Sequence, residues 1–480
     1  MLIWFVVLYL LFSVGVGLYA ARRVHTSRDF VVAGRNLPLP VVTATVFATW
    51  FGAETVLGIS ATFVQEGVGG VIADPFGASL CLILAGLFFA PLLYRMNLLT
   101  IGDYYRARYN RTVELIMSVC IMLSYLGWVA AQVVALGLVF NVVSAGAVTP
   151  QVGMVIGISV VLAYTLVGGM WSVALLDFVQ MTIIMAALLL ITVLIGEDAG
   201  GAGKVVMQAQ AAGKLQLFPQ GSGMEAWIPF IGAALTMMLG SIPQQDVFQR
   251  ITSAKSEKIA VRGAVLGGVL YFAFAFIPMF LAFAATLIDP QFFGELIERD
   301  SQMVLPSLIL NHTPLIAQVF FFGALLSAIM STASATLLAP SVMFTENILK
   351  HFAFKHMGDQ QMLRTMRIIM LAFGILVLWF ALNSESSIFH MVENAYKVTL
   401  VGAFVPLVFG LYWRRANNQG ALLSILLGLG SWLLLELLQP DTYWPPQLVG
   451  LLMSVAGMLL GSTLPDLNIK FDQSDRRSSV

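Results

Sequence analysis

The sequence has few charged residues for its length. Of its 480 residues, 10% are Asp, Glu, Lys or Arg, whereas 59% are hydrophobic, and the mean hydropathy is +0.88. A soluble domain carries roughly 25% charged residues, so this composition excludes a soluble globular protein. The formal net charge is zero, which indicates no particular partner, and no nucleic-acid partner is expected.

Cysteine is almost absent as well. Cys81 and Cys120 both fall inside apolar segments, so neither a disulfide nor a thiolate metal site is implied. The chain also lacks a Walker sequence, an HExxH motif and a dinucleotide fingerprint. ATP-driven transport and intramembrane hydrolysis therefore lack their usual parts, and we expect a protein that is not an enzyme.

Long apolar runs are abundant, and they predict an all-α polytopic membrane protein. Thirteen segments are long enough to span a bilayer: 2–21, 38–64, 70–94, 113–142, 150–169, 173–196, 226–247, 262–287, 314–345, 362–383, 388–412, 419–438 and 446–464. Lys and Arg concentrate in alternate loops, including Arg95, Arg106, Arg250 and Lys255. Since cytoplasmic loops are rich in basic residues, the N-terminus is expected outside and the C-terminus inside the plasma (inner) membrane.

A stripe of hydroxyls stands out in the ninth segment. Ser327, Ser331 and Ser334 recur at i, i+4 and i+7 of a helix, with Thr332 at the edge of the stripe. Small residues of this kind commonly allow two membrane helices to pack closely. They are also hard oxygen ligands, suited to a cation if a broken helix supplies backbone carbonyls.

Two segments carry interruptions in corresponding positions. Gly52 and Glu54 interrupt the second, and Gly240 and Pro243 interrupt the seventh. Each would be the first helix of a five-helix repeat, comprising spans 2 to 6 and 7 to 11. Paired broken helices are the sequence signature of an inverted-repeat transporter with its binding site at the midplane.

Several polar and aromatic residues at membrane depth are candidates for substrate binding. A buried Glu54 costs about 2.5 to 3.5 kcal/mol on insertion scales, so it must face a cavity or bond a neighbouring helix. Trp128 and Gln132 share a helix face and could line a pocket, although an isolated Trp is more often a packing residue. The full set of candidates is Trp50, Glu54, Asp74, Trp128, Gln132 and Gln244.

The motifs at 27–37, 101–109, 164–180, 248–250, 344–348 and 406–421 occur in the order found in the sodium:solute symporter family, which the chain resembles from about residue 1 to 465. Its motifs are most similar to those of the high-affinity choline transporter branch. The resemblance implies a leucine-transporter-like fold of five plus five helices, and it implies that Na⁺ is the coupling ion.

The resemblance also implies site residues. The sodium ligands would be Ala48, Phe51, Ala328, Ser331 and Thr332, the first three through their carbonyls. A possible second sodium would lie at Asp177 with Ser331 and Ser334, although Ala335 lacks a hydroxyl that some members have. Asp74 corresponds to a substrate-contacting acid of sugar-transporting relatives. Choline-transporting relatives carry a tryptophan where Gln244 stands, so the amide argues against choline itself.

The expected function is sodium-coupled import of a small cationic or zwitterionic solute by alternating access. Proton coupling through Glu54, Asp74 or Asp177 is one alternative, and a membrane sensor without flux is another. The expected divisions are a first helix and basic loop (1–37), the first repeat (38–196), an external loop (197–225), the second repeat (226–415), two peripheral helices (416–465) and a cytoplasmic tail (466–480). The expected partners are the substrate and the bilayer, with the choice between a monomer and a weak homo-oligomer left open.

Overall fold

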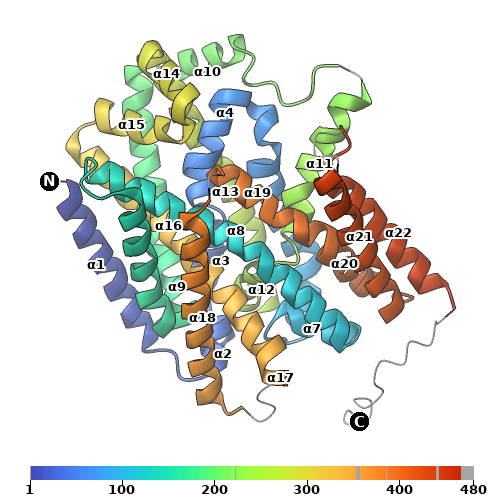
Figure 1. Cartoon of the computed structure of the whole chain (residues 1–480). Coiled ribbons are helices and arrows are strands. Elements are labelled where there is room, and N and C mark those ends of the chain that lie inside the picture. Colours follow the sequence, from blue (N-terminus) through green and yellow to red (C-terminus); the bar gives the residue numbers. More distant parts are fainter. Residues whose placement is uncertain (1, 222, 353–356, 385, 439–442, 466–480) are drawn as a thin grey trace.

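The computed structural model describes residues 2–221, 223–352, 357–384, 386–438 and 443–465, and it is a helical bundle (Figure 1). Within these residues the β pairing is one isolated bridge between Leu37 and Ala254. The helices are α1 Leu2–Ala21, α2 Ser27–Val32, α3 Leu39–Phe47, α4 Ser60–Glu66, α5 Ala78–Leu84, α6 Ala90–Arg95, α7 Ile101–Arg108, α8 Arg111–Val143, α9 Pro150–Asp198, α10 Ala202–Ala211, α11 Met224–Gly240, α12 Gln245–Thr252, α13 Glu257–Ile288, α14 Pro290–Asp300, α15 Val304–His312, α16 Leu315–Met343, α17 Lys350–Phe352, α18 Asp359–Leu382, α19 Ile388–Thr399, α20 Val405–Tyr412, α21 Asn418–Leu438 and α22 Pro446–Thr463. Turns of π-helix extend or join several of them, at Glu54–Ile59, Ile72–Gly77, Ala85–Phe89, Phe344–Leu349 and Leu400–Phe404. The tail expected at 466–480 lies outside the described residues.

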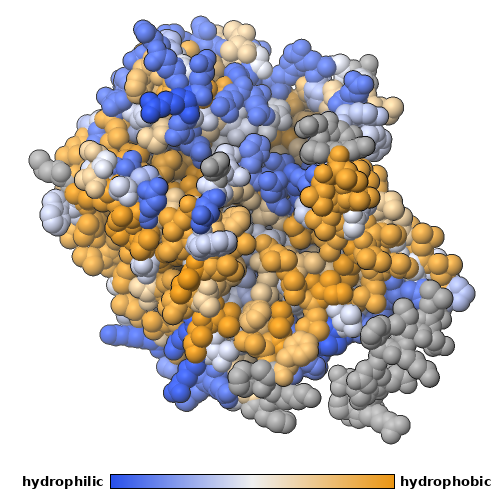
Figure 2. Space-filling model, viewed as in Figure 1, coloured by the Kyte–Doolittle hydropathy of each residue, from blue (hydrophilic) through white to orange (hydrophobic). Residues whose placement is uncertain are grey.

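An apolar belt surrounds the middle of the molecule. Figure 2 shows hydrophobic side chains across the central zone, with hydrophilic residues gathered above and below it. The short helices α10 and α14 lie at one end, and α2 and α17 lie at the other (Figure 1). Large apolar side chains such as Leu8, Ile375 and Trp379 are more than half exposed. A surface of this kind is stable only against hydrocarbon, which makes the protein an integral, multi-pass membrane protein.

The number of membrane-spanning helices in the structure differs from the number expected from the sequence. In the described part of the chain, ten helices are long and apolar enough to span a membrane, and counting the bent pair α11 and α12 gives eleven. Thirteen were expected. The difference arises because the second expected span is divided after α3, and because two expected spans form the 49-residue α9. At Gly169 this long helix has non-helical angles, φ 49° and ψ −139°, in the left-handed region that glycine tolerates.

Both predicted interruptions are present. The α-helix α3 ends at Phe47; a π-helical segment begins at Glu54 and leads into α4 at Ser60. Likewise α11 ends at Gly240 and α12 begins at Gln245, with a 47° bend between them. Each break lies in the first helix of its expected repeat, as the positions of Gly52, Gly240 and Pro243 predicted.

The centre of the bundle is built around α16, which crosses α8 and α9 and is buried without interruption from Phe321 to Met343. In Figure 1, α1 lies at one edge, and α21 and α22 lie together at the opposite edge. These last two helices pack mainly on each other, with a hydrogen bond of 2.7 Å between the hydroxyls of Ser424 and Ser454. Cys81 and Cys120 are both buried inside the bundle.

Candidate functional site: a helix break facing a hydroxyl stripe

The hydroxyls of α16 fall into two groups. Four donate to carbonyls of their own helix: Ser327 to Gly323, Ser334 to Ser331, Thr336 to Thr332 and Ser341 to Leu337. Ser331 instead donates to the carboxylate of Asp177 on α9, and Thr332 donates to the carbonyl of Ala48 at 3.3 Å. Ser331 and Thr332 thus contact other elements through their hydroxyls, and both are predicted sodium ligands.

The break after α3 lies directly against this part of α16. A Cβ at Gly52 would lie 2.6 Å from the Oγ1 of Thr332 and 2.9 Å from side-chain oxygens of Gln132 and Glu54. The absence of a Cβ at Gly52 therefore allows these three side chains to approach the break closely. Phe51, next to it, is buried and stacks on Phe47 with ring centroids 4.6 Å apart.

The predicted sodium ligands are thus divided between two elements that touch. Ala48 and Phe51 belong to the break, and Ala328, Ser331 and Thr332 belong to α16. The structure shows a direct contact for the Thr332 and Ala48 pair. All five would offer neutral hydroxyl or carbonyl oxygens, the chemistry that suits a hard cation. Among the described residues, no group of three or more His, Cys, Asp or Glu is placed to hold a metal ion.

Asp177 has neighbours that the sequence did not indicate. Its carboxylate accepts hydrogen bonds from Thr45 and Ser331, and it forms an ion pair with Arg250, whose Nη2 lies 3.9 Å away. Ser334, an expected ligand of a second sodium, instead bonds within its own helix. Arg250 was assigned to a basic cytoplasmic loop, which is wrong: the residue is 1% exposed, inside α12. Its charge is retained there because two carboxylates face it.

Glu54 bonds a neighbouring helix through both carboxylate oxygens. Gln132 Nε2 donates to one at 2.6 Å, and Trp128 Nε1 donates to the other at 3.2 Å. Gln132 also accepts from the backbone N–H of Ala53 at 3.1 Å, so its amide bridges the break and the acid. The predicted shared face of Trp128 and Gln132 on α8 is confirmed, and it faces Glu54.

Four aromatic rings gather beside Glu54, and we call them the aromatic box: Trp50, Tyr125, Trp128 and Tyr396. The Trp128 ring centroid lies 6.5 Å from that of Trp50, 5.3 Å from that of Tyr396 and 5.8 Å from that of Tyr125, which it stacks upon. The indole N–H of Trp50 donates to the hydroxyl of Tyr396. Every member is buried, so the box is closed to solvent in this conformation.

Asp74 and Gln244 lie at two other positions around this region. The Oδ1 of Asp74 accepts a hydrogen bond from Tyr271, whose hydroxyl is 2.9 Å from that of Thr55. The Oδ2 of Asp74 is buried and has no hydrogen-bond partner among the described residues. Gln244 donates to Ser124 at 2.9 Å and to Thr399 at 3.4 Å, and so joins α8 to α19.

Sequence reasoning missed several residues of this region: Thr45, Tyr125, Asp246, Arg250, Tyr271 and Tyr396. Each contacts at least one residue in a segment far along the chain. Two local signals were available: Tyr125 and Trp128 are three apart on α8, and Asp246 and Arg250 are four apart on α12. The others become neighbours only through helix packing, for which the sequence carries no periodic signal.

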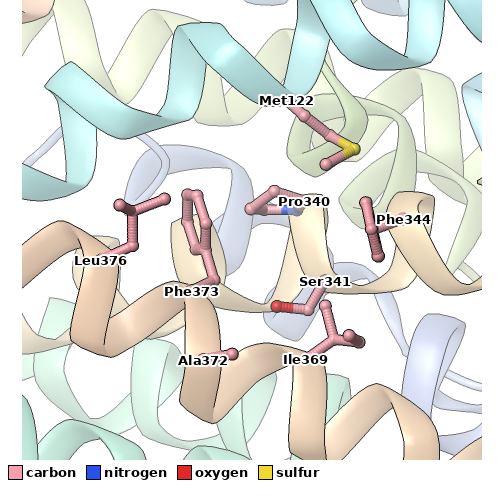
Figure 3. Close-up of a pocket in the computed structure, with 8 residues that line it drawn as sticks. All are labelled: Met122, Pro340, Ser341, Phe344, Ile369, Ala372, Phe373 and Leu376. Atoms are coloured by element: carbon pink, nitrogen blue, oxygen red, sulfur yellow. The ribbon is translucent and has the colours of Figure 1, made fainter.

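A groove of about 250 Å³ lies away from the candidate site. Figure 3 shows its lining by side chains of α8, α16 and α18 and the turn that follows α16: Met122, Pro340, Ser341, Phe344, Ile369, Ala372, Phe373 and Leu376. The one hydroxyl among them, that of Ser341, donates to the carbonyl of Leu337 in its own helix. None of the predicted site residues lines the groove, which is apolar.

The chain is similar in sequence to known transporters. The chain is 28% identical to the high affinity choline transporter 1 of Homo sapiens, over 89% of this chain and 75% of that protein. It is 26% identical to the osmoregulated proline transporter OpuE of Bacillus subtilis (strain 168), over 88% and 86% of the two chains.

Solved structures share the fold. A Na⁺-coupled sialic acid symporter in a substrate-bound outward-open state superposes with a TM-score of 0.83, at 19% identity, covering 97% of this chain and 98% of that one. A transporter of the nucleobase-cation-symport-1 family gives a TM-score of 0.59 at 15% identity, covering 90% and 94%. A model of the sodium:solute symporter family matches residues 30–428. The chain therefore belongs to the sodium:solute symporter family, whose members are transporters and not enzymes, and it is a sodium-coupled symporter of a small solute.

Proposed function

We propose that the chain imports a small cationic or zwitterionic organic solute together with Na⁺ across the plasma membrane. The observation that carries the proposal is the contact between the Thr332 hydroxyl and the Ala48 carbonyl across the break after α3. It brings two predicted ligands from distant parts of the sequence to one place. Na⁺ would be held there with Phe51, Ala328 and Ser331 completing the site.

The substrate would occupy the aromatic box. Trp50, Trp128 and Tyr396 supply ring faces that attract a cationic group, and Glu54 supplies a carboxylate beside them. Asp74 adds a buried oxygen without a partner among the described residues. Gln132 and Gln244 would contribute amides, and Gln244 stands where a quaternary ammonium cage would need another aromatic ring.

The driving force follows from charge. A membrane potential of 100 mV contributes about 2.3 kcal/mol for each positive charge moved inward. For a solute without net charge that is carried with one Na⁺, this is enough for roughly fifty-fold accumulation. We infer thirteen crossings in a five-plus-five repeat, with the N-terminus outside and the C-terminus inside. Two of the crossings would come from the two parts of α9, and one from α3 with the helix beyond the break.

The test is uptake into proteoliposomes, using a panel of labelled amines, betaines and amino acids. We expect uptake of one solute class when a Na⁺ gradient is imposed without a pH gradient. Uptake of that solute in K⁺ alone, undiminished, would overturn sodium coupling.

A second candidate is proton coupling, favoured by the unpartnered Oδ2 of Asp74. A protonated carboxylic acid can donate from such an oxygen, whereas the hydroxyls of Ser331 and Thr332 cannot take up a proton at neutral pH. Uptake driven by a pH gradient without Na⁺, and abolished by Asp74→Asn, would support this candidate over the first.

A further inference from the structure

Arg250 is a buried cation between two carboxylates. Its Nη1 donates to Asp246 on the same helix at 3.0 Å, and its Nη2 lies 3.9 Å from Asp177 on α9. All three side chains are at most 1% exposed. A charge in such a place is stable only when it is paired, so the guanidinium and the two carboxylates form one unit.

The unit is asymmetric. The contact with Asp246 is a hydrogen bond, whereas 3.9 Å is too long for one, so Asp177 attracts the guanidinium only through its charge. The Nε and Nη2 groups of Arg250 have no hydrogen-bond partner in the described part of the chain. The guanidinium thus has donors to spare on the side of Asp177, and a movement of about 1 Å would bring it into hydrogen-bond range there.

Each carboxylate leads to a different site. Asp177 accepts from Ser331, one of the proposed sodium ligands. The Asp246 carboxylate accepts a hydrogen bond from the hydroxyl of Tyr125 at 2.6 Å. The backbone N–H of Asp246 donates to the hydroxyl oxygen of Tyr125 at 2.9 Å. Tyr125 stacks on Trp128 in the aromatic box.

We propose that Arg250 couples the sodium site to the aromatic box by its position between Asp177 and Asp246. A cation held at Ser331 repels the guanidinium and favours its hydrogen bond to Asp246, which holds Tyr125 and Trp128 in place for substrate. Without the cation, the carboxylate of Asp177 attracts Arg250 more strongly, and the hydrogen bond between Arg250 and Asp246 weakens. The proposal rests on the sodium site proposed above.

Coupling between two sites requires an element with two states whose balance both sites change, and a chain of contacts alone is not enough. Here that element is the guanidinium of Arg250, which can lie closer to Asp246 or closer to Asp177. In a buried region the repulsion between two cations is weakly screened, so occupancy of Ser331 changes the balance between the two carboxylates directly. By linkage, an ordered box must in turn favour the cation. Arg250 is therefore a positioning residue that acts through its two acids.

Hydrogen exchange on the purified full-length chain tests the proposal without a known substrate, by comparing NaCl with KCl. Two segments are followed: the break at residues 48–54 and the part of α8 at residues 122–132. In the wild type we expect Na⁺ to slow exchange in both, by about fivefold or more. In Arg250→Gln, we expect slowing at the break to persist and slowing in α8 to be lost.

Because Arg250→Gln leaves two acids unpaired and could fail to fold, Tyr125→Phe is the second variant. It removes one hydroxyl at the far end of the unit and changes no charge, and we expect the same loss in α8. Tyr105→Phe is the matched control, because this buried tyrosine also donates one hydrogen bond, to the carbonyl of Ala403, outside the unit. We expect it to keep the response in both segments.

The outcomes separate the two proposals. If Na⁺ still slows hydrogen exchange in α8 in the Tyr125→Phe variant, and in Arg250→Gln where that protein folds, Arg250 does not couple the two sites. If Na⁺ no longer slows exchange either at the break or in α8 of these variants, the coupling role is also overturned, because Arg250 would then only support the ion site. A wild type whose break does not respond to Na⁺ would instead contradict the sodium site itself.

Discussion

The hydroxyl of Thr332 lies 3.3 Å from the carbonyl oxygen of Ala48, although the two residues are 284 positions apart. Ala48 is the first residue after α3, where the backbone leaves the helix, and Thr332 is in the middle of α16. The contact joins the first helix of one expected repeat to the hydroxyl-bearing helix of the other. This pairing is the basis of the first two predictions.

Replacing Thr332 with Val removes the hydroxyl and keeps the shape of the side chain. We expect the Na⁺ concentration for half-maximal uptake to rise at least about tenfold, because a loss of about 1.4 kcal/mol of binding free energy has this effect. The measurement is the Na⁺ dependence of initial uptake in proteoliposomes. Thr336→Val is the matched control, since Thr336 is equally buried and donates to its own helix. Equal behaviour of the two variants would count against Thr332 as a ligand.

Gly52→Ala adds one methyl group where Thr332 and Gln132 approach most closely. The new Cβ would lie 2.6 Å from Oγ1 of Thr332, so the Thr332 side chain must move and its contact with the break is disturbed. We expect transport to fall by more than about tenfold and the free energy of unfolding to fall by about 1 to 3 kcal/mol. The measurements are uptake and thermal unfolding in detergent.

Gly15→Ala on α1 is the control for Gly52, because nothing lies within 4 Å of its added methyl group. That variant should transport normally. If Gly52→Ala also transports at the wild-type rate, the close approach at the break is unnecessary for function.

Glu54→Gln replaces the carboxyl group beside the aromatic box with an amide. An amide offers one acceptor oxygen, whereas Glu54 now accepts from both Trp128 and Gln132, so one of these donors loses its partner. For a cationic substrate we expect KM to rise about tenfold or more, with the half-maximal Na⁺ concentration changed much less. Glu225→Gln, on an exposed residue, is the control. A KM that stays at the wild-type value would exclude Glu54 from substrate binding.

Asn347→Ala is expected to destabilise the fold at the end where α7 and α17 lie. The Asn347 amide donates to Asp103 at 3.1 Å and to Glu114 at 2.9 Å, and it accepts from Thr100 at 2.9 Å. Losing it leaves the buried carboxylate of Glu114 and the half-buried carboxylate of Asp103 without this donor, which costs about 2 to 4 kcal/mol. Thermal unfolding is the measurement. Asn383→Ala, which removes an exposed bond to the Trp379 carbonyl, should cost far less; equal losses would contradict this account.

The sequence predicted those features that repeat along a single helix. The two breaks followed from Gly52 and from Gly240 with Pro243, because glycine and proline weaken a helix wherever it packs. The stripe on α16 predicted where hydroxyls would lie, and the family resemblance distinguished Ser331 and Thr332 from the others. In the structure, Ser331 donates to Asp177 and Thr332 donates to the carbonyl of Ala48, whereas their assignment as sodium ligands stays a prediction.

What the sequence could not predict depends on contacts between distant segments. Arg250 is followed closely by Lys255 and Lys258, so its charge was read as part of a cytoplasmic loop. Its burial became evident only when α12 was placed against α9, where Asp177 faces it. Tyr271 and Tyr396 also reach the site through helix packing. In the sequence each is one aromatic residue of an apolar helix, and only its contacts in the folded protein distinguish it from the other residues of that helix.

The burial of Cys81 and Cys120 makes the native chain suitable for thiol labelling. Membrane-impermeant maleimides should react slowly with the unmodified protein, so a single cysteine placed on a helix near the aromatic box can be read without removing either native thiol. Labelling from the two sides of a vesicle would then report which face of the box opens and when. The aromatic box is closed to solvent in this structure, so the transporter must open it to one side of the membrane in every cycle. Because both native cysteines are buried, their thiols should not obscure the labelling that reports this opening.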